Sequence, residues 1–193
     1  MTSRTHDLAA ITALGVVVLL HPVDEITLST ALVAILANQI GGIAPDVDQP
    51  TAPFWRNLPS GGFFGRFVDK LLGGHRFLSH SLLGLALFGF LANLLLHFIH
   101  SLMPHVDIGL VWYAFIIGML SHLVMDTLTK EGVPWLLPIP IKFGFPPVKS
   151  LRITTGKHVE GWVVFPLLLL LDIWLCATHY NALVTFIHQH LAR

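Results

Sequence analysis

Two histidines and an arginine lie close together where a polar segment runs into a long apolar one. The segment reads His75-Arg76-Phe77-Leu78-Ser79-His80-Ser81. Ionisable side chains at or in a membrane span are energetically costly and by default indicate a functional site. His75 and His80 are five residues apart, about 140° round a helix, so both reach one point only if His75 stays in the preceding loop. We interpret this segment as part of a metal site that needs ligands from elsewhere in the chain.

A second segment spaces two ligand types along a helix. His122 and Asp126 are four residues apart, which places them about 40° apart on one helical face. Helices present two ligands to one metal ion with this spacing, as HExxH helices do. The alternative is a histidine that forms a hydrogen bond with the neighbouring aspartate and binds nothing else.

A third segment places two carboxylates after an apolar run. Asp46 and Asp48 follow Pro45, and the proline biases Ala44 away from helical angles. In an extended chain, residues two apart point to the same side. We therefore expect Asp46 and Asp48 to serve one metal ion, or two that share a carboxylate. The alternative is a solvated acidic turn after a helix.

The composition places these segments in a membrane protein. Of 193 residues, 54% are hydrophobic and only 11% are charged, whereas soluble domains carry about 25% charged residues. The formal net charge is zero, so no basic field indicates a nucleic-acid partner. The single cysteine, Cys176, excludes an internal disulfide and a cysteine-based metal site.

Five segments are apolar enough to cross a bilayer. They cover residues 8–20, 27–43, 77–99, 108–125 and 161–180. We predict one domain, residues 1–193, with an all-α fold: a polytopic helical bundle of five spans. The loops 44–74 and 127–160 are rich in glycine, proline and aromatic residues, which favours re-entrant or interfacial segments. For loop 44–74 the alternative is an active-site lid.

The positive-inside rule orients the bundle. Of the eleven Lys and Arg residues, all but Arg193 lie at the N-terminus or in the two loops. These regions share one side if there are five spans. We predict that the N-terminus and both loops are cytoplasmic and that the C-terminus is outside.

The twelve histidines divide between the two sides. His6, His75, His80, His122 and His158 lie at the predicted cytoplasmic ends of spans, and only this set is accompanied by a matching supply of aspartates, Asp46, Asp48 and Asp126. The outer histidines lack a helical His/Asp pair, and we interpret them as interfacial polar residues.

A ligand set of His and Asp without Cys favours zinc, manganese or iron over calcium or magnesium. The predicted metal ligands are His6, Asp46, Asp48, His75, His80, His122 and Asp126. They outnumber the ligands of one tetrahedral zinc ion. We therefore expect a centre of two or more divalent metal ions, with zinc as the preferred metal. Arg76 would suit a phosphoryl or carboxylate oxygen because its donors are forked; the alternative is a lipid-headgroup anchor.

The motifs also resemble a known family. In chain order they are Thr5-His6, Ala44-Pro45-Asp46-Val47-Asp48-Gln49-Pro50, His75-Arg76-Phe77-Leu78-Ser79-His80-Ser81, Ser121-His122-Leu123-Val124-Met125-Asp126-Thr127-Leu128-Thr129 and Gly132-Val133-Pro134-Trp135-Leu136-Leu137-Pro138. Together they resemble the YdjM-type family, described as LexA-regulated inner-membrane metal-dependent hydrolases. The resemblance covers residues 5–160, and Glu160 fits the family's Thr-Gly-x-x-x-Glu motif before the last span.

A more distant resemblance concerns the His-x-x-x-Asp helix alone. On an all-α scaffold it is similar to zinc-dependent phospholipase C and the P1-type nucleases, which implies a multi-zinc, phosphodiesterase-like site. Those enzymes are soluble and secreted, so this chain departs from them in its membrane location.

Together these features predict a membrane-bound metal-dependent hydrolase of a lipid-linked or membrane-proximal phosphoester or ester. His75 and Glu160 are expected to be further ligands or the acid/base, and Arg76 to stabilise negative charge on the substrate. A divalent-metal transporter or sensor is one alternative, and a structural metalloprotein of a membrane complex is another. The sequence leaves the oligomeric state open.

Overall fold

The computed structural model describes residues 1–21, 23, 26–139 and 141–191, and their regular structure is entirely helical. The α-helices are α1 (Ser3–Leu20), α2 (Leu28–Ile43), α3 (Pro53–Arg56), α4 (Gly61–Leu71), α5 (Leu82–Ile99), α6 (Ile108–Thr127), α7 (Phe165–Thr178) and α8 (Tyr180–Leu191). Short 3-10 helices η1 (Ala44–Asp48), η2 (Leu78–His80), η3 (His100–Leu102) and η4 (Lys149–Leu151) and a π-helical turn η5 (Glu160–Val164) lie between them. The prediction of an all-α fold is confirmed.

The five predicted spans are also confirmed. Segments long and apolar enough to cross a membrane are Ser3–Leu20, Leu28–Asp48, Leu82–Leu102, Ile108–Thr127 and Glu160–Thr178. The third begins five residues later than expected, because the Ser81 hydroxyl accepts a hydrogen bond from the backbone N–H of Gly84 and caps α5. Arg193, the single cation predicted on the outer side, lies outside the described residues.

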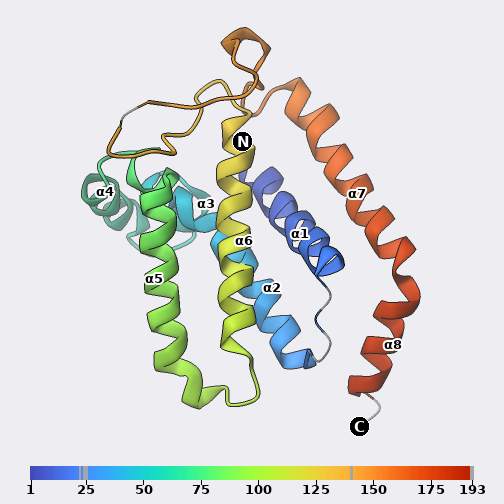
Figure 1. The fold of residues 1–193 in the computed structure, drawn as a ribbon. Helices are drawn as coiled ribbons and strands as arrows, with labels where there is room; N and C mark the ends of the chain where they lie inside the picture. The colour runs from blue at the N-terminus through green and yellow to red at the C-terminus, as the bar shows by residue number, and fades with distance from the viewer. Residues whose placement is uncertain (22, 24–25, 140, 192–193) are drawn as a thin grey trace.

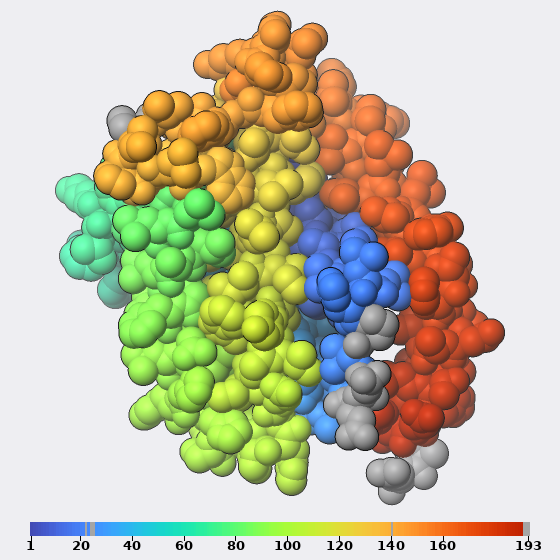
Figure 2. Space-filling view, viewed as in Figure 1, coloured from blue at the N-terminus to red at the C-terminus, as the bar shows by residue number. Residues whose placement is uncertain are grey.

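Helix α6 is the centre of the bundle (Figure 1). It packs against α2, α1 and α5, whereas α7 packs against α1 at the periphery. The N-terminus lies at one end of the bundle, and helix α8 ends at the other (Figure 1). Among the described residues of segment 128–157 there is no α-helix, and this segment covers the end of the bundle near the N-terminus (Figure 2).

Glycines bring α2 and α6 into backbone contact. A Cβ atom added to Gly118 would lie 2.0 Å from the carbonyl oxygen of Asn38, and one added to Gly41 would lie 2.1 Å from that of Phe115. The buried side chain of Asn38 donates a hydrogen bond to the carbonyl oxygen of Ala114, at 3.1 Å. Small residues permit such close packing of membrane helices. The close approach places the end of α2 beside the ligand pair on α6.

The loop between α2 and α5 contains the amphipathic helix α4. Its large apolar side chains, Phe63, Phe64, Phe67 and Leu71, are exposed, as expected for a helix that lies in the membrane interface. Trp55 of the preceding α3 donates a hydrogen bond from its indole nitrogen to the carbonyl oxygen of Val47, at 2.9 Å. The loop therefore also supports η1, which contains two of the predicted ligands.

Candidate metal centre

Four side chains from three elements converge at the end of the bundle near the N-terminus. Asp46 comes from η1, His80 from η2, and the pair His122 and Asp126 from the end of α6. The side chains of His80, His122 and Asp126 are at most 1% exposed and that of Asp46 is 17% exposed. The cluster is therefore largely shielded from solvent, and Asp46 is its most exposed member.

Four distances between the histidines and the aspartates of this cluster are close to those between ligands of one metal ion. The Nε2 atom of His80 lies 3.9 Å from Asp46 Oδ1 and 3.6 Å from Asp126 Oδ2. The Nε2 atom of His122 lies 3.6 Å and 3.9 Å from the same two oxygens. Ligands about 2.0–2.2 Å from a tetrahedral zinc ion are about 3.3–3.6 Å apart. Since 3.9 Å is too long for a hydrogen bond, a simple His122–Asp126 hydrogen bond does not describe this pair.

The orientation of the His80 and His122 rings leaves one nitrogen of each ring available to a metal ion. His122 donates a hydrogen bond from Nδ1 to the carbonyl oxygen of Gly42, at 2.7 Å. The Nδ1 atom of His80 lies 2.9 Å from Ser79 Oγ and 3.5 Å from Asp48 Oδ2. Both Nε2 atoms are buried without a hydrogen-bond partner. Buried polar atoms without partners are costly, and a metal ion bound by Nε2, with Nδ1 fixed by a second group, removes that cost.

Asp48 orients its neighbours. Its carboxylate accepts hydrogen bonds from His75 Nδ1 at 2.7 Å, from the backbone N–H of Arg76 at 2.9 Å and from the hydroxyl of Ser79. Burial lowers the pKa of His80, but Asp126 and Asp48 together outweigh burial and raise that pKa above its usual value. The surroundings of His80 thus favour a positive charge at this point, and a bound cation would supply one.

The expectation that Asp46 and Asp48 lie in extended chain is wrong. They belong to the 3-10 helix η1, and Ala44 has αR angles, with φ −53° and ψ −40°. The fixed φ of Pro45 suits the first turn of a helix, and this preference prevails over the bias of proline on the preceding residue. Residues two apart in a 3-10 helix point about 240° apart. Accordingly Asp46 faces His122, whereas Asp48 faces His75.

His6 adds a second candidate metal position. Its ring stacks on His122 with a centroid distance of 3.6 Å and an interplanar angle of 5°, and its Nε2 atom lies 3.3 Å from Asp126 Oδ1. The amino group of Met1 lies 2.9 Å from His6 Nε2 and also pairs with Asp126 Oδ1. Asp126 therefore presents one oxygen to each position. The groups able to hold a metal ion are His6/His122/Asp126, Asp46/His80/His122 and Asp46/Asp48/His75.

Arg76 is part of the wall of this centre. It is only 6% exposed, which does not suit an exposed headgroup anchor. Its Nη2 atom lies 2.6 Å from Asp126 Oδ2, and Nη1 lies 3.2 Å from Glu131 Oε2 and donates to Thr129 Oγ1. Its φ of +59° is unusual for a residue other than glycine. A strained backbone conformation at Arg76 thus holds its guanidinium group directly beside the centre.

Glu160 lies apart from the centre. The buried carboxylate of Glu160 accepts hydrogen bonds from the backbone N–H and hydroxyl of Thr2, the hydroxyl of Thr5 and the backbone N–H of Gly156, at 2.6–2.7 Å. It belongs to none of the groups able to hold a metal ion, and His158 is exposed. The π-helical turn η5 thereby fastens the start of α7 to the start of α1, which carries His6.

A family model described as YdjM inner membrane protein matches residues 1–186. The match includes every predicted ligand together with Arg76 and Glu160. No curated protein and no solved structure matches the chain. Five candidate spans and a family match that extends over nearly the whole chain lead to one conclusion: the chain belongs to the YdjM inner membrane protein family.

Proposed function

We propose that the protein is a membrane-bound, metal-dependent hydrolase of a lipid-linked or membrane-proximal ester, most plainly a phosphoester. One observation carries the proposal. The Nε2 atoms of His80 and His122 are buried, have no hydrogen-bond partner and lie 3.6–3.9 Å from two carboxylate oxygens. A set of neutral imidazoles and carboxylates favours zinc, with manganese or iron as alternatives.

The residues divide the chemistry among them. Asp46, His80, His122 and Asp126 would hold one ion, and His6 with Asp126 a second. When bound, such ions polarise a phosphoryl or carbonyl oxygen and lower the pKa of water at the site. Arg76 adds a positive charge that favours the developing anion.

His75 is the best-placed acid/base. Its side chain is 33% exposed and its Nδ1 donates to Asp48, so Nε2 is left for proton transfer. Its ring lies 5.4 Å from that of His80, centroid to centroid. A histidine oriented by a buried carboxylate and open on its other side is the usual arrangement for a general base. Glu160, by contrast, is fully occupied by its hydrogen bonds and has a structural role in this proposal.

The proposal also includes an orientation, with the metal centre and both loops on the cytoplasmic side. It rests on the positive-inside rule, because the Lys and Arg residues of the described chain gather at the end of the bundle that contains the centre. A metal transporter is less well supported, because the deeper polar residues that the structure describes form no group able to hold a metal ion, and two of them make contacts between helices. The Asn38 amide binds the Ala114 carbonyl oxygen, the Gln39 amide binds that of Asp7, and Asp172 lies beside Thr12.

The test is metal content and turnover measured on the same purified samples. We expect at least one equivalent of bound metal, and phosphatase or phospholipase activity that chelation abolishes and added metal restores. His80→Ala and Asp126→Ala are expected to lose the metal and at least a hundredfold in activity. His97→Ala, at the opposite end of α5, is the matched control and is expected to retain both. Turnover that survives complete metal removal would refute the mechanism.

A further inference from the structure

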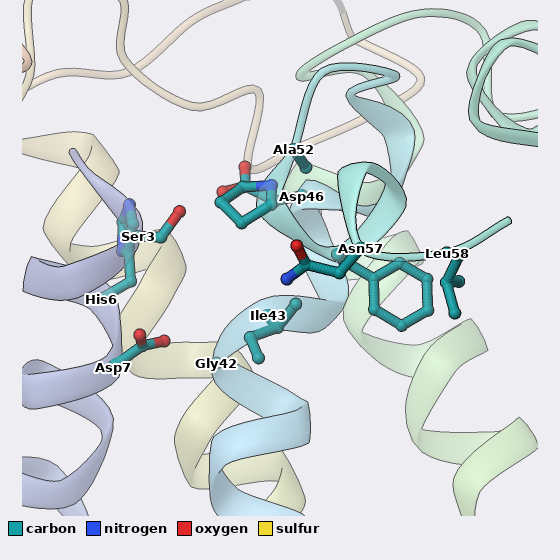
Figure 3. A pocket seen from close by; sticks show the side chains of 11 residues that line it. Ser3, His6, Asp7, Gly42, Ile43, Asp46, Ala52, Asn57 and Leu58 are labelled. Carbon is teal, nitrogen blue, oxygen red and sulfur yellow. The ribbon is translucent and has the colours of Figure 1, made fainter. Parts of the chain in front are cut away.

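A cavity of about 350 Å³ opens beside the metal centre. It lies between the first turns of α1, the end of α2 and α3 (Figure 3). His6 and Asp46 of the centre form one part of its wall, and Ile43, Phe54 and Leu58 form an apolar part. His6 is only 2% exposed and its Nδ1 atom has no hydrogen-bond partner. A cavity that is polar at the centre and apolar elsewhere suits an amphiphilic molecule.

The apolar wall continues along α2 into the part of the protein that faces lipid. Leu32, Leu36, Ile40 and Ile43 are exposed and recur at intervals of three and four residues, so they lie along one face of the helix. Ile43 is the last residue of this strip and also lines the cavity. A hydrocarbon chain in the bilayer can therefore lie on α2 while its polar end reaches the metal centre.

The charge of the cavity indicates the headgroup. The lining residues include Asp7 and Asp46 but neither lysine nor arginine. Asp46 faces the metal centre, whereas Asp7 Oδ1 is buried without a hydrogen-bond partner. The Asp7 carboxylate and the Asn57 carboxamide both point toward the space beside Ile43 (Figure 3). A phosphate would be neutralised by the metal ions, and the unpartnered oxygen of Asp7 offers an acceptor to an ammonium group on the same ligand.

We propose that the cavity binds an amine-bearing, zwitterionic phospholipid that comes sideways from the bilayer. Its phosphate lies at the metal centre, its ammonium group at Asp7 and one acyl chain along the α2 strip. The metal ions and the chemistry at the phosphate rest on the function proposed above, whereas the binding of the ammonium group at Asp7 and of the acyl chain along α2 does not. Hydrolysis would break one P–O ester bond, with the water oxygen bonding to phosphorus and a water proton passing to the leaving alkoxide.

The test is photolabelling of the purified, metal-loaded full chain in vesicles. Two probes with the same diazirine-bearing acyl chains are compared, phosphatidylethanolamine and phosphatidylglycerol. We expect the ethanolamine probe to label the α2 strip at least five times more strongly. Asp7→Asn is expected to reduce this preference to about one, while its metal content stays that of the wild type. Asp69→Asn, on α4 outside the cavity, is the matched control and keeps the preference.

Two further variants test the path along α2. Ile43→Trp and Leu58→Trp fill the cavity from different elements, and each is expected to reduce labelling at least fivefold. Leu87→Trp on α5, which is 38% exposed where Ile43 is 37%, serves as the control. Equal labelling by the two probes, or equal labelling of α5 and α2, overturns the proposal. Labelling as expected without any turnover would preserve this site and refute only the hydrolase.

Discussion

Asp48 is a carboxylate of this centre that orients other residues through its hydrogen bonds. Asp48 accepts three hydrogen bonds, from His75, Arg76 and Ser79, so few of its lone pairs remain for a metal ion. It acts on His80, whose Nδ1 lies 3.5 Å from it. Partners that orient a ligand typically contribute a factor of about 10–100 to metal affinity.

We therefore predict that Asp48→Asn weakens metal binding by about 10–100-fold without abolishing it. The asparagine keeps the size of the side chain but holds the His80 ring less firmly. Competition with a chelator of known affinity measures the change, beside His80→Ala, which is expected to lose the ion. A loss as complete as that of His80→Ala would make Asp48 a direct ligand. Asp69→Asn controls for the loss of a carboxylate near the same membrane surface.

At the scale of elements, the contact between α2 and α6 determines whether the ligands meet. A Cβ atom on Gly118 would lie 2.0 Å from the carbonyl oxygen of Asn38, and a contact so short forces the two backbones apart. The shift would move Asp46, in η1 directly after α2, away from His122. It would also stretch the hydrogen bond from His122 to Gly42.

Gly118→Ala is accordingly expected to lower both thermal stability and metal content. Overpacking of this kind typically costs about 1–3 kcal/mol. Gly62→Ala in α4 is the matched control, because a Cβ atom there meets nothing within 4 Å. Thermal unfolding in detergent and elemental analysis provide the two measurements. If Gly118→Ala keeps a full complement of metal, the close helix contact does not position the ligands.

The same contact explains what the sequence could and could not predict. Hydropathy located five spans and helical spacing paired His122 with Asp126, because both depend on local sequence alone: the first on the length of an apolar run, the second on the period of one helix. The contact of Gly118 with Asn38 depends on three-dimensional packing, which a local sequence pattern does not encode. For that reason the stacking of His6 on His122 and the hydrogen bonds of Glu160 could not be predicted. The conformation of Asp46 was mispredicted because two opposing effects of Pro45 act at the same place.

On the scale of the whole molecule, the positions of the termini agree with an odd number of spans. One end of the bundle contains the N-terminus, the segment with α3 and α4, and the described part of segment 128–157. Helix α8 ends at the opposite end (Figure 1). All Lys and Arg residues of the described chain lie at the first of these ends. From the positive-inside rule we predict that the metal centre lies on the cytoplasmic side.

Cysteine labelling tests this orientation because the chain has a single native cysteine. In a Cys176→Ser background, Lys149→Cys places a thiol in the exposed loop above the metal centre, and Ser101→Cys places one at the opposite end. A membrane-impermeant maleimide added to intact spheroplasts is expected to label Ser101→Cys and to leave Lys149→Cys unlabelled until the membrane is disrupted. The reverse pattern would place the centre on the outer side. A substrate would then have to come from the outer leaflet, and the α2 strip would have to accept lipid from there.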